Sequence, residues 1–288
     1  MDTPGANKTV MASMTPKGLI LLLGAALVAL AETSWGQKSP DWPVNWRVYR
    51  MADGLPESAC ISVALAPQGK VLARHPKSGS VSELDGYTVS VIPSPGEGSG
   101  RVYQSPGGQP WAVVADGLQE FRDGNWVLHP VPEVAAEFRT RLPRVVDPIP
   151  LCPARQGVVI FLLPDRLLQF NAEDPDLPKT EVLLTAAQTR LERFSSMTLA
   201  REGGLWIAGA RGLLKVSGPV RNLKPAPESH DYLPPEPLSI HNLQEPHEDE
   251  EGVVTALAEA AGDHPRMLVR FDGQRWSTEP VPNAKPRH

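Results

Sequence analysis

Cysteine is almost absent from this chain. Only Cys60 and Cys152 occur among 288 residues, which excludes a scaffold held together by many disulfides. The two cysteines lie in different copies of the repeat described below, so a bridge would have to cross between copies. We therefore expect two buried thiols that act as small apolar residues.

Concentrated positive charge is also missing. The chain has 28 lysine and arginine residues against 33 aspartate and glutamate residues, a formal net charge of -5, and its basic residues are scattered. Nucleic-acid binding calls for a basic patch or stripe. We therefore expect no nucleic-acid partner.

No motif of an enzyme or a metal site is present. The seven histidines show no HExxH spacing and no cysteine partners, which argues against zinc, and no Gly-x-Ser-x-Gly nucleophile elbow occurs. The stretch His247–Glu251 contains carboxylates of the kind that bind a hard cation, but we expect a solvated acidic loop. The glycine-rich stretch 95–100 lacks the lysine and the strand-to-helix context of a phosphate-binding loop, so it is expected to connect two blades. We predict no catalytic, cofactor-binding or metal-binding residue.

The residues that are present favour a folded protein made of short strands. Hydrophobic residues make up 41% of the chain, which is enough for a core. Its 31 prolines and 24 glycines interrupt the sequence often, which suits short strands and tight turns better than long helices.

The N-terminus has the composition of a secretory signal peptide. Lys8 and Lys17 precede an uncharged apolar run over residues 18–31, and Ala29–Ala31 fits an A-x-A cleavage site. The segment Ser34–Gly36 is another possible cleavage site, and Met14 is an alternative start. The run is shorter than the roughly 20 residues of a comfortable membrane span, so we favour cleavage over an uncleaved anchor.

From this N-terminus we predict the domain boundaries and the location of the protein. Residues 1–36 are expected to be the signal peptide, residues 37–43 a linker and residues 283–288 a tail. The protein is expected to be exported to the periplasm or the cell exterior, without a stable membrane span after cleavage.

A repeated sequence pattern dominates the rest of the chain. A glycine turn precedes a short apolar run, and an Asp-Gly turn with an aromatic residue follows about ten residues later. The clearest copy pairs Gly107–Val113 with Phe121–Trp126. A second pairs Gly203–Gly209 with Leu214–Gly218, and a third keeps mainly its end, Phe271–Trp276. Repeats of this kind indicate radial or solenoid stacking.

The spacing of the repeat predicts a β-propeller. The anchoring glycines Gly69, Gly108, Gly157, Gly204 and Gly252 are separated by 39, 49, 47 and 48 residues, and one four-stranded blade takes about 40–50 residues. We expect an all-β propeller over residues 44–282, with about five four-stranded blades in an incomplete or open ring. The blades are expected near residues 61–93, 101–132, 148–184, 194–225 and 238–282.

Two connections and three aromatic residues carry further predictions. Residues 185–193 are expected to be briefly helical, and the proline-rich segment 225–237 is expected to be an extended connection without secondary structure. Blades stacked around an axis bury their faces against each other. The aromatic residues after the Asp-Gly turns are therefore expected to pack between neighbouring blades; they are Tyr87, Trp126 and Trp276.

The segment Trp46–Ser58 resembles the opening of the two-component regulator propeller repeat. That repeat starts with an aromatic strand followed by Asp-Gly-Leu-Pro, here Asp53–Pro56. It continues with a Gly-x-Leu-Trp-x-Gly turn, similar to Gly203–Gly209, and ends like Phe271–Trp276. The matches span most of residues 44–282. The Asp-Gly-Leu-Pro match is fairly specific, whereas other propellers share the glycine-tryptophan turn.

The resemblance implies an exported propeller that acts as the extracytoplasmic input domain of a two-component signalling protein. In that family a membrane span and a histidine kinase or transcription regulator commonly follow, but this chain ends at His288. Residues 44–50 correspond to the last strand of a blade whose first three strands are missing. We therefore expect a partial propeller, and a further propeller or kinase segment outside this chain is a possible partner.

We predict a non-catalytic ligand-binding sensor, with a small molecule or glycan as ligand and with contact residues that the sequence does not identify. One alternative is a propeller lyase or hydrolase, which would need a basic residue and a metal at the mouth of the ring. His75 and His241 are the candidates for that role. Another alternative is a structural, protein-binding propeller of the cell envelope.

Overall fold

The computed structural model describes residues 47–96, 100–140, 149–173, 179–260 and 266–281. The predicted signal peptide, linker and tail lie outside the described residues. The chain divides into two units at Val48 and Tyr49, and every strand belongs to the second unit.

The described strands form five antiparallel sheets, each built from four consecutive strands. Blade 1 contains β1 (Ser62–Leu65), β2 (Val71–Arg74), β3 (Val81–Leu84) and β4 (Val89–Ile92). Blade 2 contains β5 (Val102–Gln104), β6 (Pro110–Val114), β7 (Gly117–Arg122) and β8 (Asn125–Pro130). Blade 3 contains β9 (Leu151–Arg155), β10 (Val158–Leu163), β11 (Arg166–Asn171) and β12 (Thr180–Thr185).

The last two blades follow the same order. Blade 4 contains β13 (Phe194–Leu199), β14 (Leu205–Gly209), β15 (Leu213–Val216) and β16 (Ser229–Tyr232). Blade 5 contains β17 (Ile240–Glu248), β18 (Val254–Ala260), β19 (Met267–Phe271) and β20 (Trp276–Pro280). The described helices are short and lie outside the sheets: η1 (Met51–Asp53), α2 (Pro132–Thr140), η2 (Ala186–Gln188), η3 (Val220–Asn222) and η4 (Glu236–Leu238).

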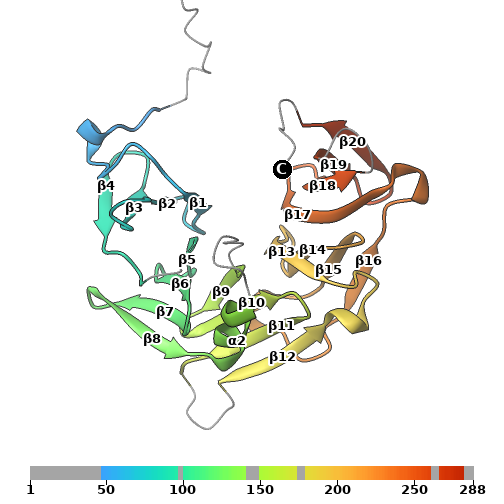
Figure 1. The fold of residues 1–288 in the computed structure, drawn as a ribbon, viewed down its shortest axis with the longest axis horizontal. Coiled ribbons are helices and arrows are strands. Elements are labelled where there is room, and N and C mark those ends of the chain that lie inside the picture. The colour runs from blue at the N-terminus through green and yellow to red at the C-terminus, as the bar shows by residue number, and fades with distance from the viewer. Residues whose placement is uncertain (1–46, 97–99, 141–148, 174–178, 261–265, 282–288) are drawn as a thin grey trace, which may run out of the picture. The chain divides into compact units, whose positions relative to one another are not determined.

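The five sheets are the blades of a β-propeller, as the repeat predicts. Consecutive blades pack together through their first two strands: β1 and β2 contact β5, β5 and β6 contact β9, β9 and β10 contact β13, and β13 and β14 contact β17. Figure 1 shows the first strands of the blades facing the centre of the second unit, with the fourth strands at its periphery. The prediction of five four-stranded blades is confirmed.

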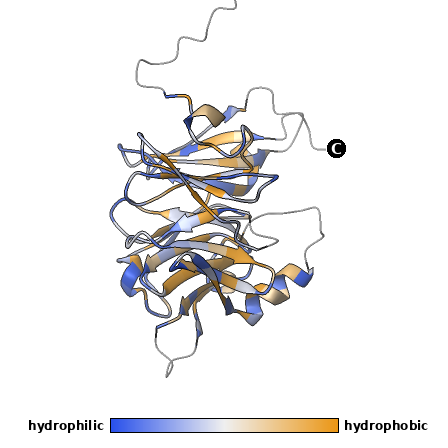
Figure 2. Cartoon of the chain, turned by 90° about the vertical axis from the view of Figure 1, so that its left-hand side faces the viewer, coloured by the Kyte–Doolittle hydropathy of each residue, from blue (hydrophilic) through white to orange (hydrophobic). Residues whose placement is uncertain are grey.

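The core is divided into clusters that lie between the blades. Leu72 and Ile92 of blade 1 share one cluster with Val102 of blade 2. Similar clusters join blades 2 and 3, blades 3 and 4, and blades 4 and 5. Hydrophobic colour accordingly follows the strands in Figure 2, and α2 carries a large hydrophilic share. Each sheet is stabilised mainly by the apolar surface that its neighbours remove from water.

The anchoring glycines have the backbone conformation that their turns require. All five lie between the first and second strands of their blades with φ between 65° and 88°, a region that favours glycine. In blade 4 the turn is closed by Gly203, whose N–H donates to the Ala200 carbonyl, as the N–H of Gly108 does to Ser105. The structural equivalent of Gly108 is therefore Gly203 rather than the predicted Gly204.

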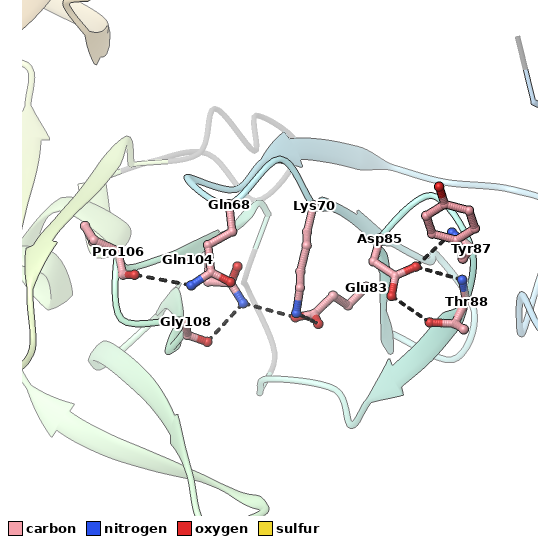
Figure 3. Close-up of polar contacts among 9 residues, drawn as sticks. All are labelled: Gln68, Lys70, Glu83, Asp85, Tyr87, Thr88, Gln104, Pro106 and Gly108. Atoms are coloured by element: carbon pink, nitrogen blue, oxygen red, sulfur yellow. Dashed lines mark hydrogen bonds and ion pairs between the residues drawn. The ribbon is translucent and has the colours of Figure 1, made fainter. Parts of the chain in front are cut away.

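Two of the Asp-Gly turns, those at Asp85 and Asp272, are held by the aspartate side chain. The Asp85 carboxylate accepts hydrogen bonds from the backbone N–H groups of Tyr87 and Thr88 and from the Thr88 hydroxyl (Figure 3). The N–H and O–H groups of Thr88 and the N–H of Tyr87 lower the pKa of Asp85 to about 2. Asp272 makes the same turn with Gln274 and Arg275.

Two of the three predicted aromatic contacts are present. The Trp126 indole N–H donates to the Pro93 carbonyl of blade 1 at 2.9 Å, and Trp276 packs on the cluster between blades 4 and 5. The prediction is wrong for Tyr87, which is 85% exposed. Trp126 and Trp276 both face the preceding blade, and no blade precedes blade 1 among the described residues.

Three segments differ from the predicted organisation. Strand β16 lies inside the segment 225–237, so blade 4 extends beyond residue 225; Ser229–Tyr232 is free of proline, and its backbone pairs with β15. Helix α2 connects blades 2 and 3 and was not predicted. Residues 47–50 are not a strand, and the sheet of blade 5 consists of β17 to β20, so the described part of 44–50 does not complete a blade.

The other predictions of this kind have mixed outcomes. The brief helix in 185–193 is confirmed as η2. Cys152 is buried, and burial raises the pKa of its thiol to about 12. Cys60 is exposed, so its predicted burial is wrong. It lies just before β1, where the chain enters blade 1.

Replacement of Gly204 by alanine is expected to destabilise the fold strongly. A Cβ atom on Gly204 would lie 2.0 Å from the Val216 carbonyl oxygen, whereas one on Gly252 would meet no atom within 4 Å. Their φ angles are similar, 80° and 82°. Gly252→Ala should cost about 1–2 kcal/mol from the left-handed backbone alone, and Gly204→Ala about 3 kcal/mol or more. Urea denaturation measures both, and equal losses would contradict the predicted clash.

Replacement of Asp85 by asparagine is expected to have a pH-dependent effect. The folded-state pKa of about 2 lies below the roughly 3.9 of an unfolded aspartate. The charged carboxylate therefore adds stability above about pH 4, and this contribution disappears as the pH falls toward 2. Thermal unfolding should show the wild type more stable than Asp85→Asn near neutral pH, with the gap closing in acid. Asp123→Asn is the matched control, and a gap independent of pH would contradict the assignment.

Candidate functional site

Strand β17 differs from the first strands of the other blades because every third residue along it is buried and the polar residues between are exposed. Ile240, Leu243 and Pro246 are buried, while the two residues after each of the first two are exposed. Asn242 and Glu245 have positive φ angles of 51° and 50°. The pairing of β17 with β18 shifts twice, as successive β-bulges do.

The bulges explain how β17 presents so many polar groups. An ordinary strand directs every second side chain toward the solvent. Each bulge adds one unpaired residue to β17, so two exposed side chains, rather than one, separate successive buried residues. The exposed pairs are His241 with Asn242 and Gln244 with Glu245. Bulges are common where a strand must re-aim a side chain at a functional position.

Blade 4 holds β17 in this conformation. The Ser195 hydroxyl donates to the Leu243 carbonyl, and the Glu245 N–H donates to the Ser196 hydroxyl at 2.7 Å. The Asn242 N–H donates to the Ala210 carbonyl at 2.8 Å. The backbone groups that the bulges remove from the β17–β18 ladder therefore gain partners in blade 4.

An ion pair joins blade 2 to blade 5. A side-chain nitrogen of Arg101, Nη1, lies 3.3 Å from Glu245 Oε2, although the two residues are 144 positions apart. Arg101 directly precedes β5, and Glu245 lies in β17. These blades are not consecutive, and both strands are the first of their blades, so the contact spans the centre where the first strands converge (Figure 1).

Tyr103 completes what we call the central cluster, Arg101, Tyr103 and Glu245. Burial raises the pKa of the Tyr103 hydroxyl, although the charge of Arg101 and the backbone of Leu151 oppose this shift. Burial disfavours the charged form of Arg101, but Tyr103 and Glu245 together raise the pKa of the guanidinium above its ordinary value. The cluster therefore holds a guanidinium that stays positively charged.

The guanidinium of Arg101 is not saturated with hydrogen bonds. Its Nε atom is buried and has no acceptor among the described residues. The side chains of Arg101 and Glu245 are nevertheless 30% and 53% exposed, so solvent reaches the cluster. A buried N–H without an acceptor is costly and uncommon in folded proteins. Among the described residues, one N–H donor of Arg101 thus has no acceptor.

Other polar groups have structural roles. Figure 3 shows Gln104 of blade 2 donating to Glu83 of blade 1 at 3.0 Å and to the Gly108 carbonyl at 2.9 Å, while Lys70 donates to Glu83 at 2.6 Å. This network ties the first turns of the two blades together. The Gln104 amide nitrogen, Lys70 and Glu83 pair with each other or with backbone, whereas the buried Gln104 Oε1 has no partner among the described residues.

A second buried carboxylate lies on the side of blade 2 that faces blade 3. The Glu120 side chain is fully buried and accepts from Arg122 at 3.0 Å, and His129 Nε2 lies 3.3 Å from it. The His129 ring stacks on Trp111, with 5.6 Å between ring centroids, and also lies against Phe170 of blade 3. The ion pairs of Glu120 and the aromatic packing of His129 give both residues a structural role at the interface between blades 2 and 3.

The two histidines considered for a lyase have separate surroundings. His75 is buried in blade 1, where Nδ1 lies 2.8 Å from the Ala59 carbonyl oxygen and Nε2 lies 2.8 Å from the Ser82 hydroxyl. His241 is exposed on β17, 3.7 Å from Glu259. No hydrogen bond or ion pair joins His75 to His241 in the described part of the chain.

The acidic stretch His247–Glu251 forms part of β17 and the turn after it. Asp249 accepts backbone hydrogen bonds from Glu251 and Val253, and Glu248 accepts from the Arg201 N–H. Among the described residues, no three or more metal-ligating side chains come together in one group. The loop 95–100 connects β4 to β5, and its residues 97–99 lie outside the described part.

Comparisons with known proteins establish the fold only. No protein-family model matches the chain, and no curated protein matches it significantly. A catalytically inactive variant of virginiamycin B lyase from Staphylococcus aureus, solved with quinupristin, is 13% identical, with 77% of this chain and 69% of that chain covered and a TM-score of 0.51.

Two further solved structures are similar at lower scores. The extracellular domain of a hybrid two-component system from B. thetaiotaomicron is 11% identical over 81% of this chain and 31% of that chain, with a TM-score of 0.49. The calcium-binding protein regucalcin from Agrobacterium tumefaciens is 12% identical over 80% and 77% of the two chains, with a TM-score of 0.47.

In the part of the chain that the structure describes, no helix has the length and hydrophobicity needed to cross a membrane.

Sequence reasoning missed the central cluster. Arg101 lies in a connection between blades, Tyr103 is one of several aromatic residues and Glu245 belongs to an irregular stretch. One signal was available. The buried residues Ile240, Leu243 and Pro246 recur every third position, a period that fits neither a regular strand nor a helix.

Replacement of Arg101 by glutamine is expected to change stability little. Its ion pair with Glu245 is partly exposed, and such pairs contribute about 0–1 kcal/mol. Arg211→Gln, which removes the exposed pair with Glu192, is the matched control. Urea denaturation should give losses below about 1 kcal/mol for both variants. A loss of about 3 kcal/mol for Arg101→Gln alone would show that the pair is a structural requirement.

Proposed function

We propose that this chain is an exported, non-catalytic propeller of sensor type that binds a small molecule or glycan at the centre of the ring. The observation that carries the proposal is the central cluster. It places an arginine side chain that is 30% exposed, and whose contact with Glu245 is a single 3.3 Å hydrogen bond, where the first strands of blades 2 and 5 meet.

The arrangement of the fold supports this location. Functional residues on rigid scaffolds concentrate on the loops and element ends that the scaffold positions. Arg101 lies at the entrance to β5, and the bulges of β17 place Glu245 opposite it. The Ser195 hydroxyl donates to β17 and the Ser196 hydroxyl accepts from it, so the backbone that carries Glu245 is fixed before a ligand arrives, which lowers the cost of binding.

The resemblance of Trp46–Ser58 and its partner motifs to the two-component regulator propeller repeat supports the sensor role, and the apolar run 18–31 supports export. The lyase alternative receives less support, because both ring nitrogens of His75 are engaged by Ala59 and Ser82. That histidine is arranged as a structural residue rather than as a base.

A thermal-shift screen of the full chain tests the proposed function. The probes are neutral monosaccharides, disaccharides and small organic acids. A ligand at 100 times its Kd should stabilise the protein by about 2.7 kcal/mol. Glu245→Ala together with Arg101→Gln should abolish the shift, whereas Glu192→Ala together with Arg211→Gln, on an exposed ion pair elsewhere, should not. A shift that persists in the first double variant, or turnover of a probe, would contradict the proposal.

A further inference from the structure

The N–H donors of Arg101 favour one chemical class of ligand. An arginine has five N–H donors in a fixed planar fork. Glu245 Oε2 meets Nη1 at 3.3 Å, which is longer than the 2.7–2.9 Å of a strong charge-assisted bond. Nε is buried and has no acceptor among the described residues, so a ligand could reach the guanidinium only at its terminal nitrogens, where Glu245 now lies. The internal carboxylate therefore pairs with the guanidinium only weakly and through one nitrogen.

A planar carboxylate is the hydrogen-bond acceptor whose geometry best fits the Arg101 guanidinium. Its two oxygens can accept two parallel hydrogen bonds from a guanidinium, a geometry that lysine or a neutral donor cannot reproduce. A phosphate would bring close to two negative charges toward Glu245, in a protein whose formal net charge is already -5. A single carboxylate carries the same charge as the glutamate that it would replace.

The environment suits the rest of a small organic acid. The side chains of His241 and Gln244 are exposed on β17, the strand that carries Glu245, and offer further polar groups. Glu245 is more than half exposed, and its backbone is fixed by Ser196. The glutamate side chain can therefore turn into solvent while the strand stays in place.

We propose that Arg101 binds the carboxylate of a small organic acid and that Glu245 occupies this position when no ligand is bound. The inference rests on the proposed function, since it assigns the ligand class of the same central cluster. It makes Glu245 a competitor of the ligand. Removal of the glutamate charge should then strengthen binding, whereas a glutamate that contacts the ligand itself would make the same change weaken binding.

Calorimetric titration of the full chain with matched acid and amide pairs tests the inference. The probes are benzoate and benzamide, N-acetylglycine and N-acetylglycinamide, and lactate and lactamide. At least one acid should bind about tenfold more tightly than its amide, as expected for a charge-assisted contact. Arg101→Gln should remove this difference, Glu245→Gln should increase the affinity for the acid about threefold or more, and Arg211→Gln should change neither.

The possible failures are distinguishable. Equal binding of acid and amide, with both weakened by Arg101→Gln, would overturn the carboxylate assignment and leave the central site standing. Weaker binding of the acid to Glu245→Gln would overturn the competition. Absence of binding by any acid at about 10 mM, where weak contacts of this kind saturate, would also overturn the inference. Binding that neither variant alters would remove the proposed function as well.

Discussion

The constraint on which this structure depends is that a four-stranded sheet has two faces and can cover neither by itself. Each described blade buries apolar side chains against the next, and the core consists of the clusters between them. Strand pairing within a blade sets the register, whereas contact between blades supplies most of the buried apolar area. The first strands of all five blades consequently meet at the centre (Figure 1).

That convergence is what brings Arg101 and Glu245 together from 144 positions apart. A place on an inner strand would not by itself produce the candidate site, because a regular strand would leave fewer polar side chains exposed. The two bulges of β17 and its hydrogen bonds to Ser195 and Ser196 add this property at one blade only. A scaffold built from repeated units thus carries its candidate site at the position where the repeat is least regular.

The repeat could be predicted because it rests on local rules. Gly108 and its equivalents need positive φ, and Asp85 holds a hairpin turn through neighbours in sequence. Predictions that needed neighbours in space were less reliable. Tyr87 follows the same local rule as Trp126, but no described blade precedes it. The central cluster joins residues of two blades, so no spacing in the sequence could place Arg101 beside Glu245, although the three-residue period of β17 marks that strand as irregular.

Arg101 is proposed as the ligand contact of the ring. A crystal structure of the full chain soaked with benzoate would show this contact. We expect electron density for the carboxylate within hydrogen-bonding distance of the Arg101 guanidinium, with the Glu245 side chain displaced from the position 3.3 Å away that it holds now. Benzoate bound elsewhere, with the Arg101–Glu245 contact intact, would contradict it.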